Sequence, residues 1–453
     1  MKRVILGAAA LLAGGIAFAQ TPPIPSGPTG PSTTATPLLG PITVPNNYVA
    51  PGPQKSAPAS ATPGVGGNYS LIDQVDSGND ANVLQEGTTN GSFIYQIGDN
   101  TSNLNTADVL QRGNVQPGTS GENNYAQIDQ DGEGNDSKTR QYGDMNDARS
   151  NQLGMNNTSS IQQGSSVAEQ AESNVGTVDQ EGNDNNASIQ QRWDNNMASS
   201  TQLGDRNKSI QEQNTAEEDG PGQIGVISQT GDDNEARQFQ QGKDPNNQDA
   251  NYAEIVQGGG SGADATDAFA QQVQEGKANE ALIEQRLSGD EAYQDQKGNR
   301  NKAIARQNLG GTTTGGDNLS MQTQDGKRNE AEVWQQGNNN RSFQEQLGDD
   351  NKVFHYQSYG QNPGEGNRAT SLQDGSMNDS QIFQGGFKNE SIVDQKGDGH
   401  MSYITQNQFG SVVNGGASTL NTATVIQRNS GDTTGLRSKT NLTKRSSSLN
   451  GSN

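Results

Sequence analysis

Amides and small residues, rather than apolar residues, carry the regular pattern of this chain. Glutamines recur every 11 residues in two long runs. These runs are Gln324, Gln335, Gln346 and Gln357, and then Gln373, Gln384, Gln395 and Gln406. The order within one unit is Q-x-G-x-x-N-x-[AS]-x-z-x-Q, where z is variable or aliphatic. A short fixed period predicts a stack of equivalent units, because every copy must meet the same surroundings.

The repeated positions of each unit indicate a β-strand followed by a turn. The Asn, the small residue, z and the Gln fall at every second position, so they share one face of a strand. Charged and aromatic residues such as Glu332 and Trp334 lie on the other face. The Gly lies in a four-residue turn, where it supplies a positive φ. Each segment that ends on such a Gln is a candidate strand, which gives 28 between Asn68 and Gln427.

A helical interpretation of the same period is disfavoured. An 11-residue period also occurs in right-handed coiled coils. A Gly and an Asn in every unit would cost such a helix roughly 1 kcal/mol or more per unit, and apolar residues are too few for a seam. The prolines that follow the Pro-rich amino-terminal segment, Pro117, Pro221, Pro245 and Pro363, all fall between the proposed strands. This placement fits a sheet, because proline lacks the backbone donor that a strand interior needs.

Composition excludes an ordinary globular core. Only 28% of the residues are hydrophobic, there are 58 glycines, and the net charge is −22. Such a polar chain would usually be disordered, unless identical strands stack about 4.7 to 4.8 Å apart and their Asn and Gln side chains bond along the stack. We therefore predict an all-β fold with Asn/Gln ladders. The alternative is a monomer that becomes ordered only on a template.

The two ends of the chain predict export and flexible flanking segments. Residues 1–19 have a basic start, an apolar run and the sequence Ala17-Phe18-Ala19, which is typical of a secretory signal peptide. Residues 20–67 form a disordered spacer rich in Pro, Ser and Thr. The repeat region covers 68–427, and 428–453 is a flexible basic tail. No other stretch is apolar enough to cross a bilayer, and the chain has no Cys for disulfides.

We expect the amides of the most regular repeats to form the structural ladders. They are Gln274, Asn279, Gln285, Gln296, Asn301, Gln307, Gln324, Asn329, Gln335, Asn340, Gln346, Asn351, Gln357, Gln373, Asn378, Gln384, Asn389, Gln395 and Gln406.

No catalytic, cofactor or metal site is expected. His355 and His400 occupy ordinary repeat positions and are interpreted as tolerated substitutions. The acidic turn at 129–134 resembles a calcium loop, but Arg140 stands where the twelfth-position Glu would be required. Nucleic acid is an improbable partner for so acidic a chain.

The repeat resembles the curlin repeat of the subunits that build curli fibres. Gln324-Gly326-Asn329-Ala331-Gln335 is one unit that carries the resemblance, which covers roughly 68–427. It implies a β-solenoid of about 14 two-strand rungs, with residue k beside k+22, whereas periodicity alone also allows a meander with k beside k+11. It further implies end-to-end polymerisation into an extracellular amyloid. Subunits of this kind leave the periplasm unfolded through an outer-membrane pore and assemble on a nucleator.

A two-strand rung also predicts where the longer gaps between strands lie. Gaps follow Gln111, Gln162 and Gln213 in the first half of the repeat region. The corresponding loops, expected on one edge of the solenoid together with the insertion between Gln240 and Gln257, are 112–123, 163–173 and 214–222. The later loops, expected on the opposite edge, are 258–267, 308–317, 358–366 and 407–420.

Two classes of function remain. The leading hypothesis is a structural subunit of a secreted curli-like functional amyloid or fimbria that contributes to cell adhesion and biofilm matrix. The alternative is a monomeric surface-attached β-solenoid, acting as an adhesin or as a surface-, ice- or carbohydrate-binding protein. An ice binder would need a flat row of identical outward residues, and the outward positions here vary freely.

Overall fold

The computed structural model describes residues 67–98, 103–112, 122–164, 171–215, 222–242, 250–259, 264–308, 316–358, 366–386, 388–406 and 421–429. These residues form strands and turns, and none of them forms a helix that could span a membrane. The predicted signal peptide and almost all of the predicted spacer and tail lie outside the described residues. Their assignment stays a prediction.

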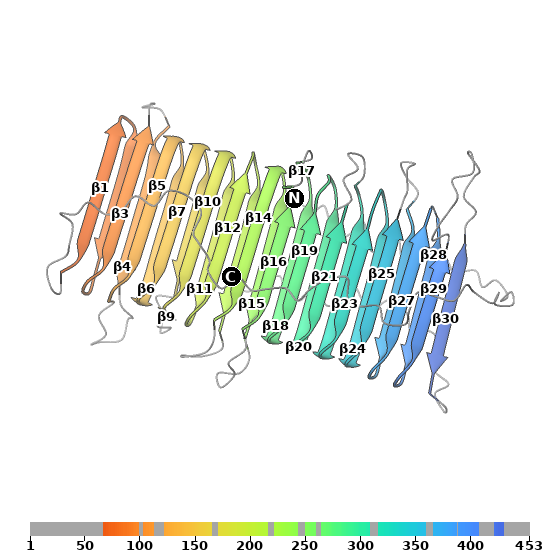
Figure 1. Cartoon of the computed structure of the whole chain (residues 1–453). Helices are drawn as coiled ribbons and strands as arrows, with labels where there is room; N and C mark the ends of the chain where they lie inside the picture. Colours follow the sequence, from red (N-terminus) through yellow and green to blue (C-terminus); the bar gives the residue numbers. More distant parts are fainter. Residues whose placement is uncertain are drawn as a thin grey trace. The chain divides into compact units, whose positions relative to one another are not determined.

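The strands form two parallel sheets (Figure 1). The 14 long strands of sheet 1 are, in spatial order, β1 (Tyr69–Asp76), β3 (Gly91–Gly98), β5 (Tyr125–Glu133), β7 (Asp147–Met155), β10 (Val175–Asn183), β12 (Met197–Leu203), β14 (Ile224–Asp232), β16 (Tyr252–Gln257), β19 (Glu280–Gln285), β21 (Lys302–Gln307), β23 (Glu330–Gln335), β25 (Lys352–Ser358), β27 (Asp379–Gly385) and β29 (Met401–Gln406).

Sheet 2 contains the strands that alternate with these along the chain. Its 14 long strands are β2 (Asn79–Gln85), β4 (Asn105–Arg112), β6 (Asp136–Asp144), β8 (Thr158–Gln163), β11 (Asn186–Arg192), β13 (Lys208–Asn214), β15 (Glu235–Gln241), β18 (Phe269–Lys277), β20 (Glu291–Asn299), β22 (Leu319–Lys327), β24 (Arg341–Asp349), β26 (Arg368–Asp374), β28 (Glu390–Lys396) and β30 (Thr422–Arg428). Two further strands of two residues each, β9 (Ala171–Glu172) and β17 (Ala265–Thr266), pair with β6 and β14.

The register confirms the two-strand rung. Gln335 in β23 lies beside Gln357 in β25, 22 residues later, and not beside Gln346. Where a long segment intervenes, the separation grows but the register is kept, as in Gln96 beside Gln130. The long strands therefore form fourteen rungs of a β-solenoid, and the meander is excluded. Parallel neighbours require a crossover, and here the crossover is the strand of the opposite sheet.

The side chains alternate as the pattern predicts. In β23, Ala331 and Val333 are buried between the sheets, whereas Glu332 and Trp334 face outward. The position z of sheet 1 holds a single file of aliphatic side chains over many rungs, including Ile94, Ile128, Ile227, Ile255 and Ile283. The small residue of each unit leaves room for these side chains. Each buried aliphatic side chain contributes roughly 1.5 to 3 kcal/mol, so this file gives the narrow core an apolar stripe over many rungs.

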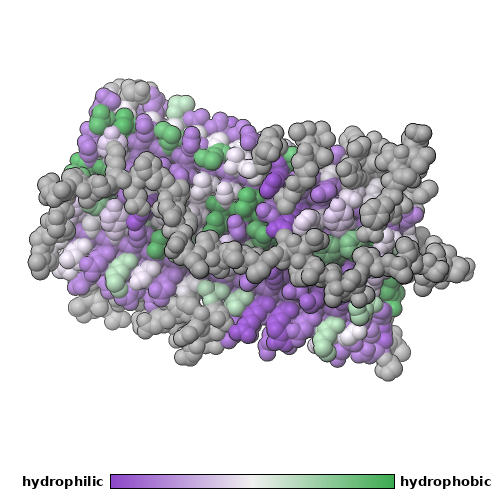
Figure 2. Space-filling view, viewed as in Figure 1, coloured by the Kyte–Doolittle hydropathy of each residue, from purple (hydrophilic) through white to green (hydrophobic). Residues whose placement is uncertain are grey.

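The outward surface is mostly hydrophilic, with scattered apolar residues (Figure 2). Its side chains interact with those one rung away. The Lys352 ammonium lies 2.9 Å from the Glu330 carboxylate, and the Arg306 guanidinium lies 5.3 Å from the centre of the Trp334 ring. Such exposed pairs contribute little individually, on the order of 0 to 1 kcal/mol. The order of the fold therefore comes from the inward residues and the backbone.

Most of the described turns have two backbone positions with a positive φ. Gly326 has a φ of 138° and Arg328, the residue before the Asn of the next unit, has a φ of 54°. A Cβ on Gly326 would overlap the carbonyl oxygen of Gly348 in the next rung. The Gly is thus required by close contact between rungs as well as by its dihedral angle. The left-handed residue before the Asn was not predicted, because many residue types occupy it.

The flanking strands have the order predicted for the two edges. The chain passes from sheet 2 to sheet 1 between β4 and β5, β8 and β10, β13 and β14, and β15 and β16. It passes from sheet 1 to sheet 2 between β16 and β18, β21 and β22, β25 and β26, and β29 and β30. We call the edge at which the chain enters sheet 2 edge I, and the other edge II. The long segments themselves lie mostly outside the described residues.

One glutamine assignment is wrong. Gln162 faces outward, and the adjacent Gln163 is the buried residue that lies beside Gln141 and Gln191. Two glutamines are consecutive here, and the prediction took the first of them as the inward one. The strand β8 extends to Gln163, so the predicted loop 163–173 begins one residue too early.

Candidate assembly site

The glutamines at the end of each strand form two uninterrupted ladders of side-chain hydrogen bonds. Each Nε2 donates to the Oε1 of the glutamine in the next rung, with N···O distances of 2.7–3.0 Å. The ladder of sheet 1 runs from Gln74 to Gln406. The ladder of sheet 2 runs from Gln85 to Gln427 in the same way. Every one of these bonds points toward the carboxy-terminal rung.

Most of these amides also join the two sheets. The Nε2 of Gln335 in sheet 1 donates to the carbonyl oxygen of Leu319 in sheet 2 at 3.0 Å. The Nε2 of Gln346 in sheet 2 donates to the carbonyl of Glu330 in sheet 1 at 2.9 Å. An amide in this position therefore satisfies one side-chain acceptor and one backbone acceptor that water cannot reach. Each such bond is worth only about 1 kcal/mol net, but leaving its partners unpaired costs more.

The asparagines form a second pair of ladders at the start of each strand. The Oδ1 of Asn301 accepts the backbone N–H of Asn329 in the next rung at 3.1 Å. The Nδ2 of Asn329 donates to the carbonyl of Gly348 at 2.7 Å. The Asn thus binds the backbone of the turn above it, and the turn Gly presents its carbonyl without a side chain in the way. This geometry explains why Asn and Gly recur together.

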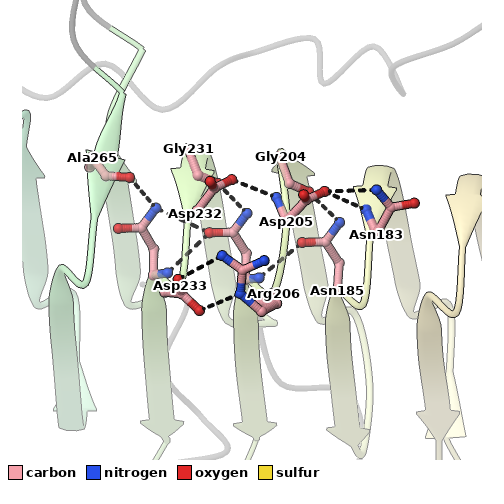
Figure 3. A network of polar contacts seen from close by, with 11 residues as sticks. Asn183, Asn185, Gly204, Asp205, Arg206, Gly231, Asp232, Asp233 and Ala265 are labelled. Atoms are coloured by element: carbon pink, nitrogen blue, oxygen red, sulfur yellow. Dashed lines mark hydrogen bonds and ion pairs between the residues drawn. The ribbon is translucent and has the colours of Figure 1, made fainter.

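Side chains within the turns add a further row of hydrogen bonds on edge I (Figure 3). The Oδ1 of Asp205 accepts both the backbone N–H and the Nδ2 of Asn183, at 2.8 and 3.1 Å. The Oδ1 of Asp232 accepts the backbone N–H of Asp205 at 2.9 Å. On the exposed side, Arg206 forms a two-pronged ion pair with Asp233 in the next turn. Carboxylates at this position therefore bind backbone donors between rungs.

The structure brings the residues proposed as ladder positions into two sets, all of them buried. Sheet 1 holds Asn279, Gln285, Asn301, Gln307, Asn329, Gln335, Asn351, Gln357, Asn378, Gln384 and Gln406. Sheet 2 holds Gln274, Gln296, Gln324, Asn340, Gln346, Gln373, Asn389 and Gln395.

A third glutamine ladder was missed in the sequence. It occupies position z of sheet 2 over six successive rungs and faces the aliphatic file of sheet 1. Its members are Gln211, Gln238, Gln272, Gln294, Gln322 and Gln344, joined at 2.8–3.0 Å. Each precedes a ladder glutamine by two residues, so the signal is a Q-x-Q triplet in every second unit.

The Asn position is held by other residues at four places in the described strands. Gln223 and His400 occupy it in sheet 1, and Ala268 and Asp290 occupy it in sheet 2. Asp290 is fully buried and accepts the backbone N–H and Nδ2 of Asn318, at 3.1 and 3.0 Å. Its other oxygen accepts the Nδ2 of Asn308 at 3.0 Å. The side chain of Asn308 thus replaces the turn carbonyl, which an acidic side chain could not bind.

Asp290 should make the stability of the solenoid depend on pH. Burial raises the pKa of this carboxyl to about 7. The pKa of this carboxyl is higher in the folded state than in the unfolded state. Its contribution to the free energy of unfolding is therefore fully present below about pH 4 and is lost as the pH rises through about 7. The stability of Asp290→Asn relative to the parent should therefore rise between about pH 5 and pH 8, by about 3 kcal/mol. Urea unfolding at the two pH values measures this gain.

The exposed neighbour Asp317 provides the control. Asp317→Asn removes a nearby negative charge but no buried carboxyl, so its effect on unfolding should be small at both pH values. An equal stability difference for Asp290→Asn at the two pH values would contradict a buried, titrating carboxyl.

His355 is a core residue that joins the two sheets. It occupies position z of β25, is completely buried, and its Nδ1 and Nε2 each lie 2.8 Å from a serine hydroxyl, of Ser342 and Ser371 respectively. Burial lowers the pKa of His355 to about 3, so the ring is neutral near neutral pH. In the described part of the chain, no group of three or more His, Cys, Asp or Glu residues is placed to hold a metal ion.

Both ends of the described solenoid present strands that have a neighbour on one side only. They are β1 and β2 at the amino-terminal end, and β29 and β30 at the carboxy-terminal end. Ile72, in position z of β1, is 42% exposed, whereas its neighbour Ile94 is 1% exposed. The core is thus uncovered at the amino-terminal end, whereas Ile404 and Gln406 of β29 are buried, with exposed fractions of 6% and 7%.

These features define a structural β-solenoid of the amyloid type, in which identical strands stack in register and amides bond along the stack. The family model of the curlin associated repeat matches residues 381–407, a segment from β27 to the residue after β29. The resemblance to the curlin-repeat family is thereby confirmed. No curated protein matches the chain.

Proposed function

We propose that this chain is a structural subunit of a secreted, curli-like functional amyloid or fimbria. In this proposal the subunits stack end to end, with the carboxy-terminal rung of one copy against the amino-terminal rung of the next. The fibres contribute to cell adhesion and biofilm matrix outside the cell. The partners are further copies of the chain, a nucleator subunit and an outer-membrane secretion pore, and nucleic acid is not among them.

The match between the first and last rungs carries the proposal. Aligned by their ladder glutamines, β29 and β1 place Ser402, Ile404 and Gln406 against Ser70, Ile72 and Gln74. The strands β30 and β2 match equally well. They place Ala423, Val425 and Gln427 against Ala81, Val83 and Gln85. All inward positions except the Asn position of β29 are therefore identical across the junction.

Such a junction would continue every axial feature of the solenoid. The ladder direction requires that Gln406 donates to the Oε1 of Gln74, and Gln427 to that of Gln85. The aliphatic file would continue from the buried Ile404 to Ile72, covering the apolar surface that Ile72 exposes in a single copy. Edge strands with unpaired backbone groups are templates for further strands. The polarity of the bonds favours head-to-tail over head-to-head contact.

Fibre formation by the mature chain tests the proposal. Purified protein from residue 20 onward should form thioflavin-positive fibres whose diffraction has a meridional reflection at about 4.7 Å. Seeds should shorten the lag, because each end offers a formed rung. A chain that folds but stays monomeric under seeding would exclude the fibre subunit and favour the monomeric adhesin.

The amino-terminal segment provides a second expectation. Residues 20–67 carry no repeat, so deleting them should leave fibre formation by purified protein unchanged while impairing secretion or surface attachment. The seeded elongation rate of the deletion variant, compared with that of the full mature chain, measures the first effect. Loss of assembly in the test tube would show that the segment belongs to the stacking core.

A further inference from the structure

The Asn position has a fixed acceptor role at the contact between rungs. In sheet 1 the Oδ1 of Asn351 accepts the backbone N–H and Nδ2 of Asn378, both at 3.1 Å. The same bond to the backbone N–H recurs between Asn378 and the next residue of the file, His400, at 3.0 Å. A residue in this position therefore offers an acceptor to the next rung. At the carboxy-terminal end of sheet 1 that residue is His400.

His400 uses one ring nitrogen as the asparagines use their Nδ2. Its Nε2 lies 3.0 Å from the carbonyl oxygen of Lys396, four residues earlier. The Nδ2 of Asn301 makes the same contact with the carbonyl of Lys297 at 3.1 Å. A carbonyl oxygen only accepts, so Nε2 carries the proton. The neutral ring then leaves Nδ1 as its sole acceptor, in the role that Oδ1 has in asparagine.

We propose that the carboxy-terminal end of sheet 1 docks a second copy of this chain through His400, whose unprotonated Nδ1 accepts the backbone N–H of Asn68. This proposal rests on the head-to-tail stacking proposed above. The junction between copies then differs chemically from the internal rung contacts. In those contacts the acceptor at the Asn position is the side-chain oxygen of Asn, Gln or Asp, and Ala268 supplies none. Assembly then requires a neutral imidazole at each junction, whereas the internal rungs do not.

Protonation removes the acceptor and puts a donor in its place. A protonated His400 directs an Nδ1–H toward the N–H of the incoming Asn68, so the two donors oppose each other. Histidine is the side chain that ordinarily changes charge between about pH 5 and pH 8. The charged residues around His400 are Lys396 and Asp398 in its own turn, and Asp374 and Asp379 in the neighbouring turn and at the start of β27. On the incoming copy, Asn68 and Tyr69 are uncharged near neutral pH.

Within one chain the loss of an acceptor is tolerated. Ala268 occupies the same position in sheet 2 and offers no side-chain acceptor to the next rung, but the covalent chain holds that rung in place. A contact between two copies has no such tether. The effect of a missing acceptor is therefore expected at the junction, in the rate at which subunits add.

Seeded elongation of the full mature chain at about pH 7.5 and about pH 5.5 tests the proposal. The variant His400→Asn restores the residue of the neighbouring rungs. The variant His400→Gln places there the residue type that Gln223 supplies just before β14. We expect elongation of the parent to slow about tenfold relative to both variants on acidification, equivalent to about 1.4 kcal/mol. Comparison with the variants removes the general effect of acid on a chain of net charge −22.

The outcomes separate the two proposals. An identical pH profile for the parent and both variants overturns the role of His400 and leaves fibre formation intact. Failure of all three proteins to elongate from seeds at about pH 7.5 overturns head-to-tail assembly and the junction with it. Circular dichroism of each protein before seeding verifies that the variants have the same strand content as the parent.

Discussion

Replacing Gln335, Gln346 and Gln357 together by Ala should abolish stable stacking in this part of the solenoid. Each of the three side chains is fully buried and takes part in ladder bonds on both of its sides. The change would orphan three backbone carbonyls and the ladder amides of the adjacent rungs. An unpaired buried polar group costs about 1 to 3 kcal/mol, so the total should be comparable to the stability of a typical domain, about 5 to 15 kcal/mol. Urea unfolding and seeded elongation measure the two consequences.

Outward glutamines of the same sheets provide a matched control. Gln190, Gln271 and Gln381 lie at outward positions of β11, β18 and β27. Their joint replacement by Ala removes three amides of the same kind without touching a ladder, and should leave unfolding and elongation almost unchanged. Equal loss of assembly in the two triple variants would show that the ladders do not drive stacking.

A single methyl group should also destabilise the solenoid at the Gly of a turn. In Gly326→Ala the new Cβ would overlap the carbonyl oxygen and carbon of Gly348, which are backbone atoms with little freedom to move. The φ of 138° is also strained for any L-residue. We expect a loss of about 2 to 4 kcal/mol. The midpoint of urea unfolding should fall accordingly, and seeds of the variant should elongate poorly.

The variant Gly399→Ala distinguishes the cost of the steric overlap between rungs from the cost of the positive φ. Gly399 also has a positive φ, of 72°, but nothing lies within 4 Å of the position of its Cβ. The free energy of unfolding of this variant should fall only by the cost of placing a non-glycine residue in the left-handed conformation, about 1 to 2 kcal/mol. A loss for Gly399→Ala as large as that for Gly326→Ala would mean that the approach between rungs adds nothing.

The sequence was sufficient to predict the strands and their inward faces, because both follow from the period of two along a strand and the period of 11 along the chain. The fourteen two-strand rungs were predicted from the resemblance to the curlin repeat. The pairing of Gln335 with Gln357 required the resemblance to the curlin repeat, since an 11-residue period fits two topologies. The edges then followed from counting strands. In such a stack, the spacing of residues along the chain determines which side chains face inward, and the pairing of strands then determines the edges.

The sequence did not predict contacts that depend on neighbouring rungs. The ladder from Gln211 to Gln344 repeats only in every second unit, so it is visible once alternate strands are known to share a sheet. The hydrogen bond from the Nδ2 of Asn308 to the carboxylate of Asp290 joins residues that are 18 positions apart. At the consecutive pair Gln162 and Gln163, the 11-residue step from Gln152 selects Gln163, and burial agrees with that choice. These features are set by packing between rungs, which one unit does not encode.

Because the register is kept across the long segments, the solenoid has a fixed spacing between rungs along its whole described length. With fourteen rungs about 4.8 Å apart, one copy spans about 65 Å along the stacking axis. In the second half of the chain, the places where a long segment leaves sheet 1 recur at every second strand of that sheet, after β16, β21, β25 and β29. Evolution could vary the length and chemistry of these segments without disturbing a single ladder bond. A fibre of such copies would display epitopes at intervals of about 9.6 Å, first along one margin and then along the other.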